Sequence, residues 1–243
     1  MHYEDSNFLQ YYSKPEKIMS ELITKRNKEN TAYKNPGIFA CPSFQDIFKN
    51  IYQMRSQFDT EFKIPSFLWE KKHATKEDMA EYFPVKSQFA AFRLRPSSFD
   101  GYQNMIYDMN WIFFSEEPLM MRVTPPWFPH TSPCDGAILS SGEYDIGQWF
   151  RQITLDYHIL NNTNIFKISK NDPLIYVEFK TDRPIILKQF KLRDSMKEIQ
   201  KKYTVEFRKN HGQNKTLLFR YNEMNNNGVN KEILKQIKKN LID

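Results

Sequence analysis

The sequence predicts an α+β fold, in which an antiparallel β-sandwich or barrel is flanked by N-terminal helices and a C-terminal helical extension. Three observations support this prediction. Between about Pro84 and Lys191, short runs of β-branched and aromatic residues are separated by Pro, Asn, Asp and Gly at intervals of about 8 to 15 residues, which is typical of antiparallel sheets. One of these runs alternates strictly between apolar and polar residues. On either side of the region, apolar residues recur at the spacing of amphipathic helices.

The N-terminal segment is expected to be helical. Ser13 to Glu16 combines the spacing of a capping box with an early-turn proline, and Ile18 and Leu22 follow at helical spacing. The turn Asn35-Pro36-Gly37 then closes this segment. Residues 1–36 are therefore predicted to form a helical arm that packs on this chain or on a neighbour.

Two further short helices are expected before the main strand region. One begins at Ser43, with Asp46 in the capping position, and continues through Ile51. The other spans Thr75 to Phe83 and ends before Pro84, because a residue that precedes proline disfavours the helical conformation.

About eight to ten strands are expected in the core, residues 37–190, which is enough to close a barrel or to pair two sheets. The clearest is Ile153 to Ile159, whose alternation requires one buried face. Tyr52 to Phe58 and Glu61 to Ile64 are expected to form an outer hairpin. The remaining candidates are Phe89 to Leu94, Trp111 to Phe114, Leu119 to Thr124, Ala137 to Leu139, Ile165 to Ile168, Leu174 to Phe179 and Ile185 to Phe190.

The helical period returns in residues 191–243, the predicted C-terminal extension. An amphipathic helix is expected first, followed by an Asn-rich loop from Asn222 to Gly228 and a final helix from Asn230 to Leu241. The residues on the apolar face of the first helix are Leu192, Met196, Ile199 and Tyr203, and those of the final helix are Ile233, Ile237 and Leu241.

The positive charge of the chain is concentrated near its C-terminal end. The formal net charge is +6, and residues 188–243 carry 14 Lys and Arg against 6 Asp and Glu, so the other 187 residues have a net charge of −2. Such clustering indicates either a surface that attracts nucleic acid or an acidic partner, or a solvated helical face. The alternation of basic with acidic residues favours the solvated face.

Composition and motifs exclude several protein classes. With 40% hydrophobic and 26% charged residues the chain has the composition of a folded protein, and Cys41 and Cys134 are too few for a disulfide framework. The sequence lacks a Gly-rich phosphate loop and the signatures of zinc proteases, zinc ribbons and α/β-hydrolases. No apolar run reaches about 20 residues, and Met1 to Asp5 does not begin a signal peptide. The expected location is a host cytoplasm or a virion, neither secreted nor in a membrane.

Several segments resemble uncharacterised tailed-bacteriophage proteins. They are Gly142 to Arg151, the strand that follows it to Ile159, the run Phe166 to Val177, and the upstream stretch from Cys41 to Asp59. The resemblance covers about Gly37 to Phe190 and implies a phage origin and a β-barrel core. The low content of Gly and Ala, against many Asn, Lys, Ile and Phe, indicates an AT-rich genome, as in many bacteriophages.

A more distant similarity is to the trimeric dUTPase-like barrel. In that family a Gly-x-x-Asp turn, here Gly142 to Asp145, precedes a strand, and nucleotides bind between subunits. The family's phosphate-binding and glycine-rich C-terminal motifs are absent from this chain. The similarity implies an alternative nucleotide pocket that contains Asp145, Arg151 and His158.

The loop from Pro125 to His130 is the favoured site for partner binding. Its three prolines stiffen the backbone, while Trp127 and Phe128 offer apolar area at low entropic cost. The alternative is that these aromatic side chains fold back onto the barrel. The predicted partner-binding residues are Trp127, Phe128, His130, Lys197, Lys201 and Lys202.

A second group of residues has the chemistry of a metal or acid–base site. It consists of His130, Asp135, Glu143, Asp145, Arg151 and His158. Its spacing matches no metal-ligand signature, so neither a metal nor a cofactor is expected. Four arginines, Arg93, Arg95, Arg122 and Arg151, have the chemistry to hold a phosphate or to pair with neighbouring carboxylates.

The favoured interpretation is a phage-type accessory protein that acts by binding, as a component of a macromolecular assembly or as a binder of a host macromolecule. A viral or host protein is the expected partner, with nucleic acid at the basic extension and self-association as further alternatives. An enzyme, in the form of a nucleotide-binding or nucleotide-hydrolysing β-barrel, is the less favoured interpretation.

Overall fold

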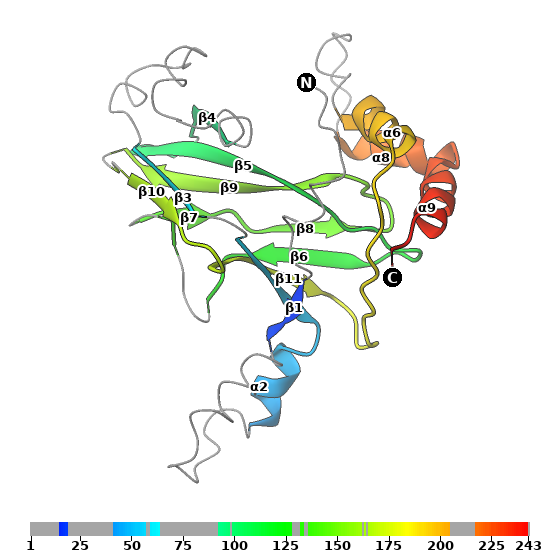
Figure 1. Cartoon of the computed structure of the whole chain (residues 1–243), viewed down its shortest axis with the longest axis horizontal. Coiled ribbons are helices and arrows are strands. Elements are labelled where there is room, and N and C mark those ends of the chain that lie inside the picture. Colours follow the sequence, from blue (N-terminus) through cyan, green and yellow to red (C-terminus); the bar gives the residue numbers. More distant parts are fainter. Residues whose placement is uncertain are drawn as a thin grey trace. The chain divides into compact units, whose positions relative to one another are not determined.

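The computed structural model describes residues 15–18, 41–56, 59–63, 92–97, 99–127, 132–133, 136–161, 163, 165–204 and 217–242. The predicted α+β fold with antiparallel sheets is confirmed (Figure 1). The chain forms two compact units, each assembled from separate stretches of sequence. The first contains Met1–Met109, Arg122–Gly142 and Thr154–Glu178, and the second contains Asn110–Met121, Glu143–Ile153 and Phe179–Asp243.

Among the described residues, strands dominate the first part of the chain and helices the last. The strands are β1 (Glu16–Lys17), β2 (Ile51–Arg55), β3 (Thr60–Lys63), β4 (Phe92–Pro96), β5 (Tyr102–Ile112), β6 (Met120–Thr124), β7 (Ile138–Leu139), β8 (Gly142–Asp145), β9 (Gln152–Leu160), β10 (Ile165–Ile168) and β11 (Pro173–Phe179). The helices are α2 (Pro42–Ile47), α6 (Asp194–Thr204), α8 (Leu217–Asn226) and α9 (Val229–Lys239).

In the described ranges the strands pair in three sheets. A five-stranded sheet has the order β1-β2-β11-β6-β8, a four-stranded sheet has the order β4-β5-β9-β7, and β10 pairs with β3 alone. Strand β11 lies between β2 and β6 and is buried over nearly its whole length, as expected for an interior strand. Strand β7 is a two-residue edge strand that pairs Ile138 with His158 and Leu139 with Tyr157.

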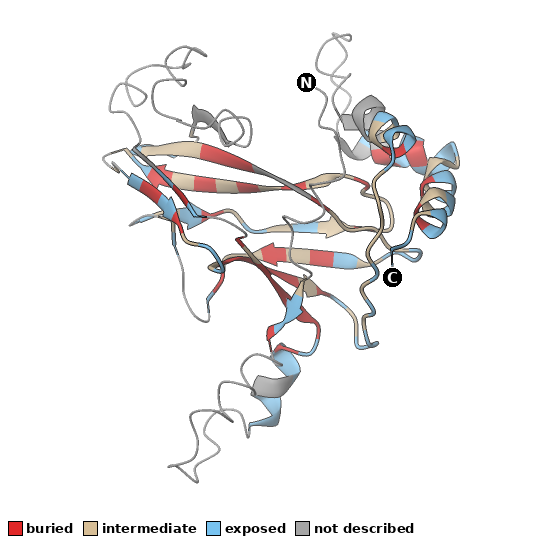
Figure 2. Ribbon diagram, in the orientation of Figure 1, coloured by how far each residue is buried: buried red, intermediate tan, exposed pale blue. Residues whose placement is uncertain are grey.

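Strand β9 confirms the clearest prediction from the sequence. Ile153, Leu155, Tyr157 and Ile159 are all buried, while the residues between them are partly exposed (Figure 2). Successive side chains of a strand point to opposite faces, so this alternation shows that one face of β9 packs against the interior. The predicted strands Ile165 to Ile168 and Leu174 to Phe179 are likewise present, as β10 and β11.

The start of the predicted N-terminal helix is wrong. Glu16 and Lys17 form strand β1, which pairs with the edge of β2. The Glu16 carboxylate lies 3.2 Å from Arg55 Nε, and Ile18 is buried in a cluster with Phe48, Ile51 and Tyr176. Pairing with β2 thus outweighs the local helical signal at Glu16 and Lys17, whereas Ile18 is helical and packs on its own unit. The rest of the predicted arm and the predicted helix Thr75 to Phe83 lie outside the described residues.

Three other predictions in the first half of the chain need correction. The short helix α2 is present, but Asp46 lies in its last turn rather than at its start, and Ile51 already belongs to strand β2. Strands β2 and β3 are also present, yet they do not form the expected hairpin. Instead β2 pairs with β1 and β11, and β3 pairs with β10, because long-range pairing rather than the intervening turn determines the partners.

The helices of the second unit share one apolar cluster. Met196 of α6, Tyr221 and Met224 of α8, and Ile233 and Ile237 of α9 are buried together with Phe150. Within this unit the indole of Trp149 stacks on Tyr221 at a centroid distance of 4.1 Å. The predicted apolar faces are confirmed for Met196 in α6 and for Ile233 and Ile237 in α9, whereas Leu241, also expected on the second face, lies beyond the end of α9 and is 36% exposed. No helix in the described ranges is long and apolar enough to cross a membrane.

Two predictions in the C-terminal part are wrong. Residues 222–226 of the Asn-rich segment, expected as a loop, form the second half of helix α8, because Tyr221 and Met224 contribute to the apolar cluster and this packing outweighs the poor helix propensity of Asn. Gly228, with a φ of 68°, then separates α8 from α9. The run from Ile185 to Phe190 is not a strand: Ile186 is 81% exposed, and only an isolated bridge joins Phe190 to Leu241.

Truncating Ile233 tests whether the shared cluster stabilises the C-terminal helices. Because this side chain is fully buried, Ile233→Ala is expected to reduce the free energy of unfolding by about 2 to 5 kcal/mol. Lys235→Ala, on the exposed side of the same helix, is the matched control and is expected to change it by less than about 0.5 kcal/mol. Urea denaturation followed by circular dichroism measures both, and equal effects of the two substitutions would contradict the assignment of the cluster as a core.

Candidate functional site

Trp127 combines a fixed position with an exposed surface. Its ring centroid lies 4.9 Å from that of Phe48 and 5.7 Å from that of Tyr176, and both of these partners are fully buried. Pro125 and Pro126 precede it and restrict the backbone. Even so, 43% of Trp127 is exposed. We call Trp127 with Phe48 and Tyr176 the Trp127 platform: one part of the indole is anchored in the interior, and the remainder is available to a partner.

The platform unites the two alternatives that the sequence left open for this loop, since Trp127 both contacts the interior and presents a surface. Phe128 and His130 lie outside the described residues. Lys197 belongs to the second unit and forms an ion pair with Asp194 at 3.3 Å. Lys201 and Lys202 lie on helix α6, and their side chains are not described.

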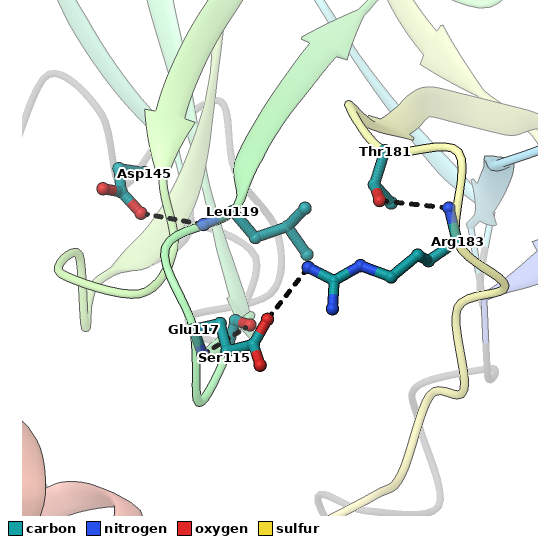
Figure 3. Close-up of polar contacts among 6 residues, drawn as sticks. All are labelled: Ser115, Glu117, Leu119, Asp145, Thr181 and Arg183. Carbon is teal, nitrogen blue, oxygen red and sulfur yellow. Dashed lines mark hydrogen bonds and ion pairs between the residues drawn. The ribbon is translucent and has the colours of Figure 1, made fainter.

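Asp145 holds two loops together. Its Oδ1 atom accepts hydrogen bonds from the backbone N–H of Leu119 at 3.1 Å and of Gly147 at 3.0 Å, and its Oδ2 atom accepts one from Gln148 Nε2 at 3.0 Å. Figure 3 shows the bond to Leu119. Both carboxylate oxygens of this predicted nucleotide-binding residue are therefore used within its own unit.

The loop that precedes Leu119 is fixed by further polar contacts. Its Glu117 N–H donates to Ser115 Oγ, and the Glu117 carboxylate pairs with Arg183 at 2.9 Å (Figure 3). Arg183 is positioned in turn by a bond from its N–H to Thr181 Oγ1. A Cβ atom on Gly147 would lie only 2.7 Å from the Glu117 carbonyl oxygen, so this close approach requires glycine.

The other residues of the predicted nucleotide pocket and its arginines have different surroundings. Arg151 is partly exposed and, like Asp145, belongs to the second unit, whereas His158 belongs to the first. Arg122 lies 3.7 Å from the Glu178 carboxylate, which matches the expected alternative of an ion pair with a neighbouring carboxylate. Glu143 is exposed. The side chains of Arg93 and Arg95 and the residues His130 and Asp135 are not described.

His158 is bracketed by two hydroxyl groups on the partly exposed face of β9. Its Nε2 atom lies 2.9 Å from Ser140 Oγ and its Nδ1 atom 3.3 Å from Ser97 Oγ, while Phe99 packs edge-on at 4.9 Å. A hydroxyl beside an imidazole is the first requirement of nucleophilic catalysis, but in Ser-His-Asp triads a carboxylate faces the other ring nitrogen. Here a second hydroxyl occupies that position. His158 on β9 thus connects the segment after β4, through Ser97, with the segment after β7, through Ser140.

Sequence reasoning missed Ser97 and Ser140, because neither belongs to a motif. The only signal that could have found Ser140 was the predicted strand Ala137 to Leu139: once its register against β9 is known, Ser140 lies opposite Asp156 and diagonal to His158 on the same face.

A small cavity lies in the first unit beside this region of β9 and β11. Its volume is about 40 Å³, far below the roughly 300 to 1,000 Å³ of a small-molecule pocket, so it accommodates water rather than a nucleotide. The pKa of Lys167, at its rim, is raised by a hydrogen bond and by the charge of Glu61, 2.8 Å away. The lining includes Pro125, Pro126, Ala137, Leu139, Tyr157, Lys167, Asp172 and Leu174.

The described ranges contain no group of three or more His, Cys, Asp and Glu side chains arranged to hold a metal ion. Comparisons of the chain with protein-family models, with curated proteins and with solved structures found no match. The resemblance to tailed-bacteriophage proteins and the more distant similarity to dUTPase-like barrels therefore stay predictions.

Replacement of Asp145 tests its role as a loop anchor. Asp145→Ala removes three hydrogen-bond acceptor contacts of a partly buried carboxylate and is expected to lower the free energy of unfolding by about 2 to 3 kcal/mol. Asp145→Asn retains an oxygen for the N–H groups of Leu119 and Gly147. It is therefore expected to lower the free energy of unfolding by about half as much as Asp145→Ala. Thermal and urea denaturation measure the difference, and an unchanged stability of Asp145→Ala would show that the carboxylate is not required for the fold.

Proposed function

We propose that this protein acts by binding another macromolecule, and that Trp127 is an anchor of that interface. The observation that carries the proposal is that an indole held against two buried aromatic side chains is still 43% exposed. Tryptophan is among the residues that contribute most to binding energy at protein interfaces. An exposed tryptophan with a fixed position is therefore well suited to this role.

The packing of the platform lowers the cost of binding. Ordering a flexible side chain at an interface costs about 0.5 to 1.5 kcal/mol, and the contacts with Phe48 and Tyr176 order Trp127 before a partner arrives. Ile47, which precedes Phe48 on helix α2, is 55% exposed and adds apolar area from a neighbouring position in the chain. Trp127 and Ile47 are thus the exposed apolar side chains that this region offers to a protein interface.

A protein partner fits this surface better than a nucleotide or a nucleic acid. The residues that form the platform are apolar, and the excess of positive charge lies in residues 188–243 rather than here. The nearby cavity is too small for a nucleotide. The partner class that we propose is a viral or host protein, with this chain as a phage-type accessory protein. Two observations support a phage origin: the sequence resemblance over about Gly37 to Phe190, and a composition that is low in Gly and Ala and rich in Asn, Lys, Ile and Phe.

Capture of partners by the tagged full-length protein from a lysate of phage-infected cells tests the proposal. We expect a protein to be recovered in stoichiometric amount with the wild type and to be reduced at least tenfold with Trp127→Ala, since loss of a central tryptophan commonly costs 2 kcal/mol or more. Quantitative mass spectrometry measures the recovery.

Ile186→Ala provides the matched control, because Ile186 is an apolar residue that is 81% exposed. This variant is expected to recover the partner as the wild type does. Trp127→Phe keeps an aromatic ring beside Phe48 but removes part of the exposed surface. Comparing the melting temperatures of all variants then separates loss of the binding surface from loss of stability. Equal recovery by Trp127→Ala and the wild type would overturn the role of Trp127, and the absence of any stoichiometric protein would overturn the proposed function.

A further inference from the structure

Helix α9 carries a continuous basic face. Lys231, Lys235, Lys238 and Lys239 recur at the spacing i, i+4, i+7 and i+8, and all four are exposed. With a rise of 1.5 Å per residue, the face extends over roughly 12 Å of the helix axis. We call these four lysines the α9 basic face. From it we propose that the second unit binds the phosphate backbone of nucleic acid.

Further positive charge lies at the C-terminal end of the helix. Arg193 Nε donates to Asn240 Oδ1 at 2.8 Å, and the Lys191 N–H donates to the Asn240 carbonyl at 2.9 Å, so the segment that precedes α6 runs beside the end of α9. Lys238 is paired with Glu116 at 2.7 Å. Among the described residues, the other three lysines of the basic face have no ion-pair partner, so their charges are available to a ligand.

The stability of the helix itself does not account for this arrangement. Cations favour the C-terminal end of a helix, which explains Lys238 and Lys239, but Lys231 lies in the first turn, where the helix dipole disfavours a positive charge. Moreover, Lys231 and Lys235, and Lys235 and Lys239, are pairs of like charge at i, i+4, which destabilise a helix, and the single carboxylate of Glu232, three residues before Lys235, offsets only part of this repulsion. A polyanion removes this repulsion, so binding turns an unfavourable feature of the free protein into a favourable one.

The burial of α9 favours a nucleic acid over a lipid surface. An amphipathic helix binds a membrane by inserting its apolar face, but Ile233 and Ile237 are buried within the second unit and only the basic face is presented. Duplex DNA places roughly seven phosphates along 12 Å of its axis, which is more than enough for the lysines of the basic face to contact. Lysines that contact phosphates read no base sequence, so the expected binding is sequence-independent.

Fluorescence anisotropy of the full-length protein with a labelled 24-base-pair duplex DNA tests the proposal. The affinity is expected to fall as NaCl rises, with a slope of log K against log[NaCl] of about −3 for the three lysines that have no ion-pair partner among the described residues. The triple variant Lys231→Glu, Lys235→Glu and Lys239→Glu is expected to weaken binding about 100-fold or more and to reduce the slope by about three. Changing the same three lysines to Gln preserves helix propensity and is also expected to weaken DNA binding and to reduce the slope.

The matched control reverses three exposed lysines of the first unit: Lys17→Glu, Lys49→Glu and Lys170→Glu. It changes the net charge by the same amount, so an equal loss of affinity would show that only the total charge matters and would overturn the proposal. Binding of the wild type to vesicles of anionic lipid but not to DNA, or to neither, would also overturn it. Trp127→Ala is expected to leave DNA binding unchanged, which separates this inference from the proposed function.

Discussion

Strand β9 must keep one face buried along its length, and much of the first unit follows from this requirement. Leu155, Tyr157 and Ile159 are buried, so a shift of register by one residue would bring Asp156 and His158 into the interior and expose the apolar face. The same register pairs Leu139 with Tyr157. Ser140 is thereby placed 2.9 Å from His158. The hydroxyl-bracketed histidine is thus a result of apolar burial on the opposite face of the strand.

Polar side chains that have the chemistry of a catalytic site serve here to connect segments. A partly buried carboxylate or imidazole requires hydrogen-bond partners, and in this protein the partners come from its own loops. Asp145 accepts hydrogen bonds from Leu119, Gly147 and Gln148, and His158 faces two serines. These contacts account for the positions of the Asp145 and His158 side chains.

The two surfaces that we propose for binding share a physical design. In each, apolar contacts within the protein hold one side of an element, and the other side is left in solvent. The ring contacts of Trp127 with Phe48 and Tyr176 serve this purpose in the first unit, and the burial of Ile233 and Ile237 does so for α9 in the second. Because the anchoring contacts are already formed, less conformational entropy is lost when a partner binds. The exposed sides differ in chemistry, one aromatic and one basic, so they suit different partners.

Local periodicity made β9, β10, β11, α6 and α9 predictable, because the spacing of apolar residues follows directly from strand and helix geometry. Residue type and position also drew attention to Trp127, with its exposure left open, and located the excess of positive charge in residues 188–243. Only the tertiary structure decided that Glu16 and Lys17 form a strand, that β3 pairs with β10, and that the Asn-rich segment is helical. It also brought Ser97 and Ser140 to His158, far from both in sequence. These features depend on contacts between distant residues, whose energies outweigh local propensity and leave no pattern in the sequence around them.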